Sequence, residues 1–128
     1  MNDITMLFDH LIAANSPVST TLHQVRSLMG STAAPERPVR TLHVSDIIAV
    51  LRKFLDLQIS ANELQEWAEV LSMNDWIAYA EEESATIADV LFQLSTPEIN
   101  VPLTANSVSD LLQDLVSGNA DGGVSGPA

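Results

Sequence analysis

The apolar residues of this chain recur every three or four positions along most of its length, and this period constrains the fold more than any other feature. The stretch "SANELQEWAEVL" is the clearest case. Its apolar residues fall on one face of a helix, and they are Leu64, Trp67, Ala68 and Leu71. Five further segments show the same period, within residues 4–12, 22–29, 47–55, 87–94 and 108–115. No alternation of apolar and polar residues bounded by hairpin signals appears. We therefore predict an all-α fold, a compact bundle of five or six short helices.

Polar residues mark where several of these helices are expected to begin. Ser60 and Glu63 have the capping-box spacing, in which the serine oxygen accepts from the glutamate amide and the carboxylate reaches back. Ser45, Ser84 and Thr104 are expected to be the N-caps of the segments that follow them. The stretch "DWIAYAEEES" after residue 74 fits either a short helix or a helical turn that leads into a loop.

Proline, glycine and small residues indicate where the chain is irregular. The stretch "GSTAAPERPVR", residues 30–40, contains two prolines and few apolar residues, so it is a loop or linker and a candidate boundary. A chain of 128 residues most simply forms one domain. Residues 118–128 are small and polar and cannot bury enough surface to become ordered. We expect one helical domain over residues 1–117 and a disordered C-terminal tail over 118–128.

Composition excludes several classes of protein. The chain has no cysteine, so it has no disulfide, no thiolate catalysis and no cysteine-based zinc site. The longest clean apolar run, Ile47 to Leu51, is far shorter than the ~20 residues that a membrane helix needs. The opening stretch "MNDITMLFDH" carries Asp3 and Asp9 and no Lys or Arg, unlike a secretory signal. We therefore expect a soluble, cytoplasmic protein that has no membrane partner.

No pattern of catalytic or metal-binding residues stands out. His10, His23 and His43 are far apart, and none has the spacing that places two imidazoles on one helix face around a metal. There is no Walker-type glycine loop and no nucleophile elbow. Five basic residues against seventeen acidic ones cannot neutralise a phosphate track. We expect a protein that is not an enzyme, needs no metal or cofactor and binds no nucleic acid.

The charge is distributed unevenly along the chain. All five Lys and Arg residues lie in the first 53 positions, and they are Arg26, Arg37, Arg40, Arg52 and Lys53. Four acids in that part leave a balance of +1, whereas thirteen acids and no Lys or Arg from Phe54 onward give −13. Such a field repels nucleic acid and anionic membranes and speeds the encounter with a basic protein. A surface that is acidic only for solubility is the alternative explanation.

The densest acidic region lies between residues 63 and 83. Glu63, Glu66 and Glu69 fall on the side of their predicted helix opposite the apolar face. We therefore expect an unpaired, solvent-facing row of carboxylates there.

Aromatic residues beside this row make it a candidate interface, because Tyr and Trp next to carboxylates are typical of surfaces that bind basic proteins. The candidate partner-binding residues are Glu63, Glu66, Glu69, Asp75, Trp76, Tyr79, Glu81, Glu82 and Glu83. Trp67 is expected to lie in the core, whereas Trp76 and Tyr79 fit a core or an interface equally well.

The segment "SANELQEWAEVL…NDWIAYAEEE", with "LFQLSTPEINVPLT" after it, resembles the small acidic helical immunity proteins of bacterial toxin systems. The resemblance covers residues 45–117 and is one of size, charge and general pattern. It implies a protein without catalytic activity whose acidic face binds a cognate toxin, often a nuclease with a basic active site, and blocks it. It assigns no role to an individual residue.

Two other functions stay open at this point. An acidic surface can imitate nucleic-acid phosphates and inhibit a DNA-binding protein, which requires carboxylates spaced along an elongated face. The chain can also be a structural or oligomerising helical module of bacterial origin, whose leucine stripes are shared between copies in a homo-oligomer.

Overall fold

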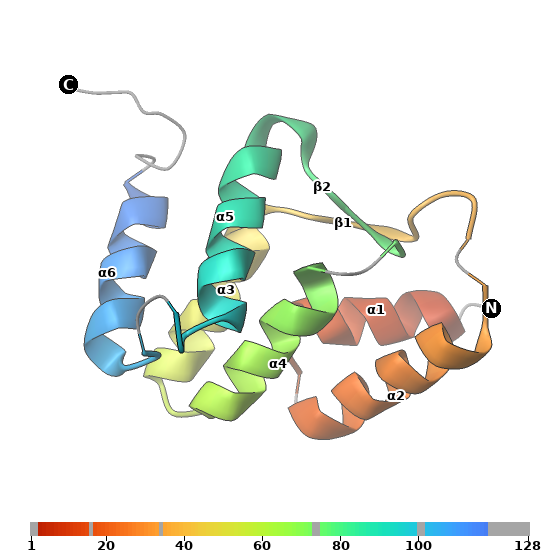
Figure 1. Cartoon of the computed structure of the whole chain (residues 1–128), viewed down its shortest axis with the longest axis horizontal. Helices are drawn as coiled ribbons and strands as arrows, with labels where there is room; N and C mark the ends of the chain where they lie inside the picture. Colours follow the sequence, from red (N-terminus) through yellow and green to blue (C-terminus); the bar gives the residue numbers. More distant parts are fainter. Residues whose placement is uncertain (1–2, 16, 34, 73–74, 100–101, 118–128) are drawn as a thin grey trace.

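Six α-helices make up most of the chain in a computed structural model, which describes residues 3–15, 17–33, 35–72, 75–99 and 102–117 (Figure 1). The elements in chain order are α1 (Asp3–Ala13), α2 (Val18–Ser31), β1 (Arg40–Leu42), α3 (Val44–Leu55), α4 (Ala61–Ser72), β2 (Ile77–Tyr79), the 3₁₀ helix η1 (Glu81–Glu83), α5 (Ser84–Ser95) and α6 (Ala105–Val116). The predicted all-α bundle of five or six helices is confirmed. The tail predicted to be disordered, 118–128, lies outside the described residues.

The helices pack in pairs that run from one end of the molecule to the other. α1 packs on α2, α2 on α4, α4 on α5, and α3 on α6. Figure 1 shows α1 and α2 at one end, α6 at the opposite end, and α3 and α4 between them. Every helix contributes to one core of buried residues, which includes Phe8, Val25, Ile47, Leu91 and Val108. Residues on both sides of the candidate boundary at 30–40 therefore pack together.

A short parallel sheet replaces part of the structure predicted after residue 74. β1 and β2 pair in the register Arg40 with Ile77 and Leu42 with Tyr79. The prediction of a helix or helical turn is wrong at residues 77–79, and the predicted loop over 30–40 is wrong at both ends, because α2 continues to Ser31 and residue 40 is in β1. Strands of three residues are too short to show alternation, and their pairing joins segments far apart in the chain, so local signals do not reveal them.

Two of the predicted helix starts are confirmed by their hydrogen bonds. The amide of Glu63 donates to Ser60 Oγ at 3.1 Å, and the amide of Ser60 donates to Glu63 Oε1 at 2.8 Å. The amide of Ser107 likewise donates to Thr104 Oγ1 at 3.1 Å. These bonds satisfy amides that a helix leaves without intrahelical partners.

The other two predicted starts are wrong. α3 begins at Val44, before Ser45, and the amide of His43 donates to Asp46 Oδ2 at 2.9 Å. Ser84 is the first residue of α5 and gives no side-chain cap, because η1 leads directly into the helix. In this chain, the predicted caps that are confirmed are those in which the N-cap residue and the residue three positions later bond to each other.

The contacts of α1 join the N-terminal helices to the rest of the molecule. The indole N–H of Trp67 on α4 donates to the backbone oxygen of Leu11 at 2.7 Å, and the ring of Trp76 stacks on that of Phe8 with centroids 5.5 Å apart. These contacts cross more than fifty residues of sequence and fix the position of α1 against α4 and β2.

The end of α3 carries a residue in a strained backbone conformation. Leu57 has φ 66°, in the left-handed region that favours glycine. Its amide donates to the Phe54 oxygen at 3.0 Å and the next amide, of Gln58, donates to the Lys53 oxygen at 2.9 Å, which is the Schellman pattern. The Leu57 side chain is 90% exposed, so its packing contacts offset little of the free energy of this strain.

Leu57→Gly is expected to raise the free energy of unfolding by about 0.5–1 kcal/mol, because the relief of left-handed strain exceeds the added entropy of the unfolded chain. Leu57→Ala keeps the strain and is the matched control, with an expected change near zero. Urea denaturation followed by circular dichroism measures both. A stabilisation by alanine equal to that by glycine would show that the side chain, and not the backbone, carries the effect.

Candidate partner-binding surface

The predicted row of carboxylates on α4 is not unpaired. Arg26 of α2 lies 3.5 Å from Glu66 through Nη1 and 3.5 Å from Glu69 through Nη2. Glu63 is held in the capping box that begins α4. The prediction of an unpaired row is therefore wrong, because α2 packs beside α4 and brings a base from the other part of the chain. Side chains of Arg26 and both glutamates stay about half exposed, so these ion pairs contribute little to stability.

The acids that follow β2 have different roles. Glu83 Oε1 accepts from the amide of Val44 at 3.0 Å and so satisfies the first turn of α3. Asp75, Glu81 and Glu82 are exposed, and within the described part of the chain none of them forms an ion pair. Glu81 and Glu82 also lie just before α5, where negative charge complements the helix dipole. Of the predicted acids, these three are the ones left open to a partner.

The aromatic residues lie mostly inside the molecule. Trp67 is 0% exposed, which confirms its predicted place in the core. Trp76 is only 5% exposed and stacks on Phe8, so the structure places it in the core and not on the acidic surface. Tyr79 is half-buried, and its hydroxyl donates to the backbone oxygen of Leu71 at 3.4 Å. Tyr79 is therefore a partly buried residue at the edge of the core, against which it packs.

Burial raises the pKa of the Tyr79 phenol above its ordinary value of about 10. Because the folded state disfavours the phenolate, we expect stability to be unaffected below about pH 10 and to fall as the pH rises toward the folded-state pKa. Tyr79 is the only tyrosine, so the ultraviolet absorbance of its phenolate reports this one group, with the urea-unfolded chain as control. An ordinary midpoint in the folded protein would place the ring in solvent and make it available to a partner.

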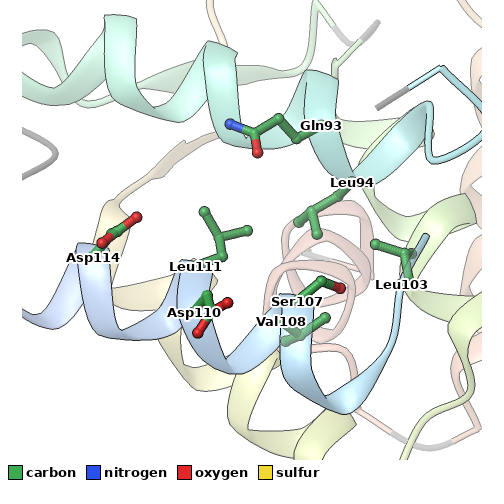
Figure 2. Close-up of a pocket in the computed structure, with 8 residues that line it drawn as sticks. All are labelled: Gln93, Leu94, Leu103, Ser107, Val108, Asp110, Leu111 and Asp114. Atoms are coloured by element: carbon green, nitrogen blue, oxygen red, sulfur yellow. The ribbon is translucent and has the colours of Figure 1, made fainter. Parts of the chain in front are cut away.

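A second acidic surface, which the sequence interpretation missed, lies between α5 and α6. We define the α5–α6 groove by its lining residues, which are Ala85, Thr86, Asp89, Val90, Gln93, Leu94, Leu103, Ser107, Val108, Asp110, Leu111, Asp114 and Leu115. It consists of adjoining hollows of about 430 and 210 Å³. Figure 2 shows Gln93 and Leu94 of α5 on one side and Leu111 and Asp114 of α6 on the other.

The groove exists because its two walls pack on different neighbours. α5 packs mainly on α4, whereas α6 packs mainly on α3, so the two helices lie next to each other without closing together (Figure 1). The sequence does indicate the acidic wall on α6, since Asp110 and Asp114 stand one helical turn apart on either side of Leu111. The spacing alone does not show that α5 faces this stripe.

The described residues do not form a metal site or a membrane span. Across residues 3–15, 17–33, 35–72, 75–99 and 102–117, no three His, Asp or Glu side chains gather in a group that could hold a metal ion. No helix in those ranges is long and apolar enough to cross a bilayer. The main features of the surface of the described residues are therefore its carboxylates, its apolar groove and its few basic side chains.

Comparisons with known proteins return no relative. The chain matches no family model, and neither a curated protein nor a solved structure matches it.

Proposed function

We propose that this protein is a non-catalytic binding protein that recognises a basic protein partner through its surface carboxylates, as an immunity-type inhibitor of a toxin does. The observation that carries the proposal is the excess of unpaired acid on the second part of the chain. Thirteen acids follow Phe54 without a Lys or Arg, and Arg26 is the only residue of Lys or Arg type seen to pair with any of them among the described residues.

Unpaired charge of one sign keeps a protein soluble and also attracts a partner of the opposite sign. A field of this strength steers a basic protein toward the surface and raises the rate of association at low salt. An inhibitor needs no catalytic group of its own, because covering a basic active site is sufficient. Asp75, Glu81 and Glu82 are exposed and have no ion pair among the described residues, so they are proposed as contacts with the partner.

The test begins by identifying a partner and ends with a purified complex. The tagged protein is used to capture proteins from a lysate of its source at low salt, and each captured protein is then purified and titrated against it. We expect a basic protein that binds with a dissociation constant in the micromolar range or below and whose own toxicity or activity falls when the two are co-expressed.

Other outcomes overturn the proposal in distinguishable ways. A partner that also binds DNA and is displaced by DNA in competition would favour the nucleic-acid mimic. A mass that doubles with concentration in the purified protein, with no basic partner captured, would favour the oligomerising module. A partner without excess positive charge would remove the role proposed for the carboxylates.

A further inference from the structure

The floor of the α5–α6 groove is an apolar surface that the chain leaves partly uncovered. Leu94 and Val108 are buried at its base, while Leu103 and Leu111 are only partly covered. Phe92 is 50% exposed and lies one turn from Asp89 on α5.

The rim of the same groove is acidic on both sides. Asp89 stands on α5, and Asp110 and Asp114 stand on α6, all of them exposed. Gln93 Nε2 donates to Asp89 Oδ2 at 2.9 Å, and within the described part of the chain none of these three aspartates forms an ion pair. Asp110 and Asp114 repel each other at one-turn spacing, and Asp114 also opposes the dipole at the end of α6. A cation bound between the walls relieves both effects.

We propose that the α5–α6 groove binds an amphipathic helix of the partner, with Lys or Arg flanking its apolar anchors. This inference rests on the proposed function and names the part of the basic partner that is recognised. The groove walls are helices whose backbone groups are already bonded within each helix, so they offer no edge to an added strand. A helical ligand satisfies its own backbone and presents only side chains.

The size of the groove sets the spacing of the anchors. The lining extends from Ala85 to Leu94 on α5, which corresponds to about 13 Å of helix. Two and a half turns of a bound helix fit this length, so the expected anchors stand at positions i, i+3 or i+4, and i+7. Lys or Arg one position before or after an anchor then reaches the acidic rim.

Charge decides between this occupant and two others. A second copy of the chain would bring the same aspartates against each other across a symmetric interface. The segment over 118–128, "GNADGGVSGPA", has no base and adds Asp121. A basic helix is the occupant that complements both the floor and the rim.

The probe is a synthetic peptide of about 15 residues, near the length at which isolated helices begin to form, with Leu at the anchor positions and Lys beside them. Its controls are a scrambled peptide of the same composition and one with Glu in place of every Lys. We expect the first peptide alone to bind the full-length wild-type protein. Backbone amide shifts in nuclear magnetic resonance should change at Val90, Gln93, Ser107 and Leu111 and not in α1 or α2.

The matched variants carry equal charge changes. D110K/D114K is expected to weaken binding of the Lys peptide by tenfold or more, on the order of what close charge pairs contribute, while E36K/D56K changes it less than about twofold. Shifts confined to Asp75, Glu81 and Glu82, equal binding of the Glu peptide, or no binding overturns the inference. Because shift mapping uses the wild-type protein, a misfolded variant does not leave the result open.

The native partner separates this inference from the proposed function. If D110K/D114K binds the purified partner as the wild type does while E81K/E82K loses it, the groove assignment is wrong and the proposed function stands. If no basic protein binds, the proposed function fails, and the peptide titration still decides what the groove accepts. A concentration-dependent doubling of mass that D110K/D114K strengthens would assign the groove to a second copy.

Discussion

Trp67→Ala is expected to lower the free energy of unfolding by about 3–5 kcal/mol, the range for truncating a buried tryptophan. Trp67 is 0% exposed at the centre of the core, and its indole N–H reaches from α4 to the Leu11 oxygen on α1. The substitution removes the packing of α4 and this link to α1 together. Since a domain of this size is stable by only about 5–15 kcal/mol, a large part of its stability is lost.

Trp67→Phe separates the two contributions. It keeps an aromatic ring in the core and removes the indole hydrogen bond, and the amide of Ala14 still donates to the Leu11 oxygen at 3.0 Å. The carbonyl is therefore not left without a donor, and we expect a smaller loss than for alanine, about 1–2 kcal/mol. Urea denaturation followed by circular dichroism measures both variants. A loss below about 1 kcal/mol for Trp67→Ala would contradict a packed core at this position.

The double charge reversal E81K/E82K is expected to weaken binding of the native partner about 100-fold, or about 2.7 kcal/mol. Both carboxylates are exposed, and within the described part of the chain neither forms an ion pair, so their replacement costs only their favourable interaction with the dipole of α5 and keeps the fold. Lysine at these positions repels a basic surface and leaves its cations unpaired. Calorimetric titration of the purified partner gives the dissociation constant.

The matched control for this reversal is E36K/D56K. Both residues are exposed; Glu36 lies between α2 and β1 and Asp56 follows α3, so the net charge changes equally at positions away from η1. We expect its affinity to stay within about threefold of the wild type, a change carried by the overall field alone. Equal losses in the two variants would show that total charge, and not these carboxylates, controls binding.

The helices could be predicted from the sequence because each one carries its own signal. The apolar period and the Ser60–Glu63 box place α4, and Thr104 with the leucines after it places α6. The strands could not be predicted in this way. β2 forms because residues 77–79 pair with β1, and Trp76, just before β2, stacks on Phe8 of α1. Both are contacts between distant segments, which a local pattern does not contain.

The total charge of the surface could be predicted from the sequence. Which carboxylates already have partners within the protein could not. The acids on α4 are spaced as expected, yet Arg26 reaches two of them because α2 packs beside α4. Glu83 is directed to the start of α3 by the turn at η1. The α5–α6 groove depends on two helices that pack on different neighbours, so it follows from the tertiary arrangement alone.

The dependence of the dissociation constant on salt tests the central claim most directly. The purified partner is titrated against the wild type, E81K/E82K and E36K/D56K over a series of ionic strengths. Exposed charge pairs are screened by salt, so we predict that wild-type affinity falls steeply as salt rises, that E36K/D56K follows it, and that E81K/E82K shows a much weaker dependence. An affinity that is independent of salt, or one whose salt dependence is the same in all three proteins, would contradict recognition through these carboxylates.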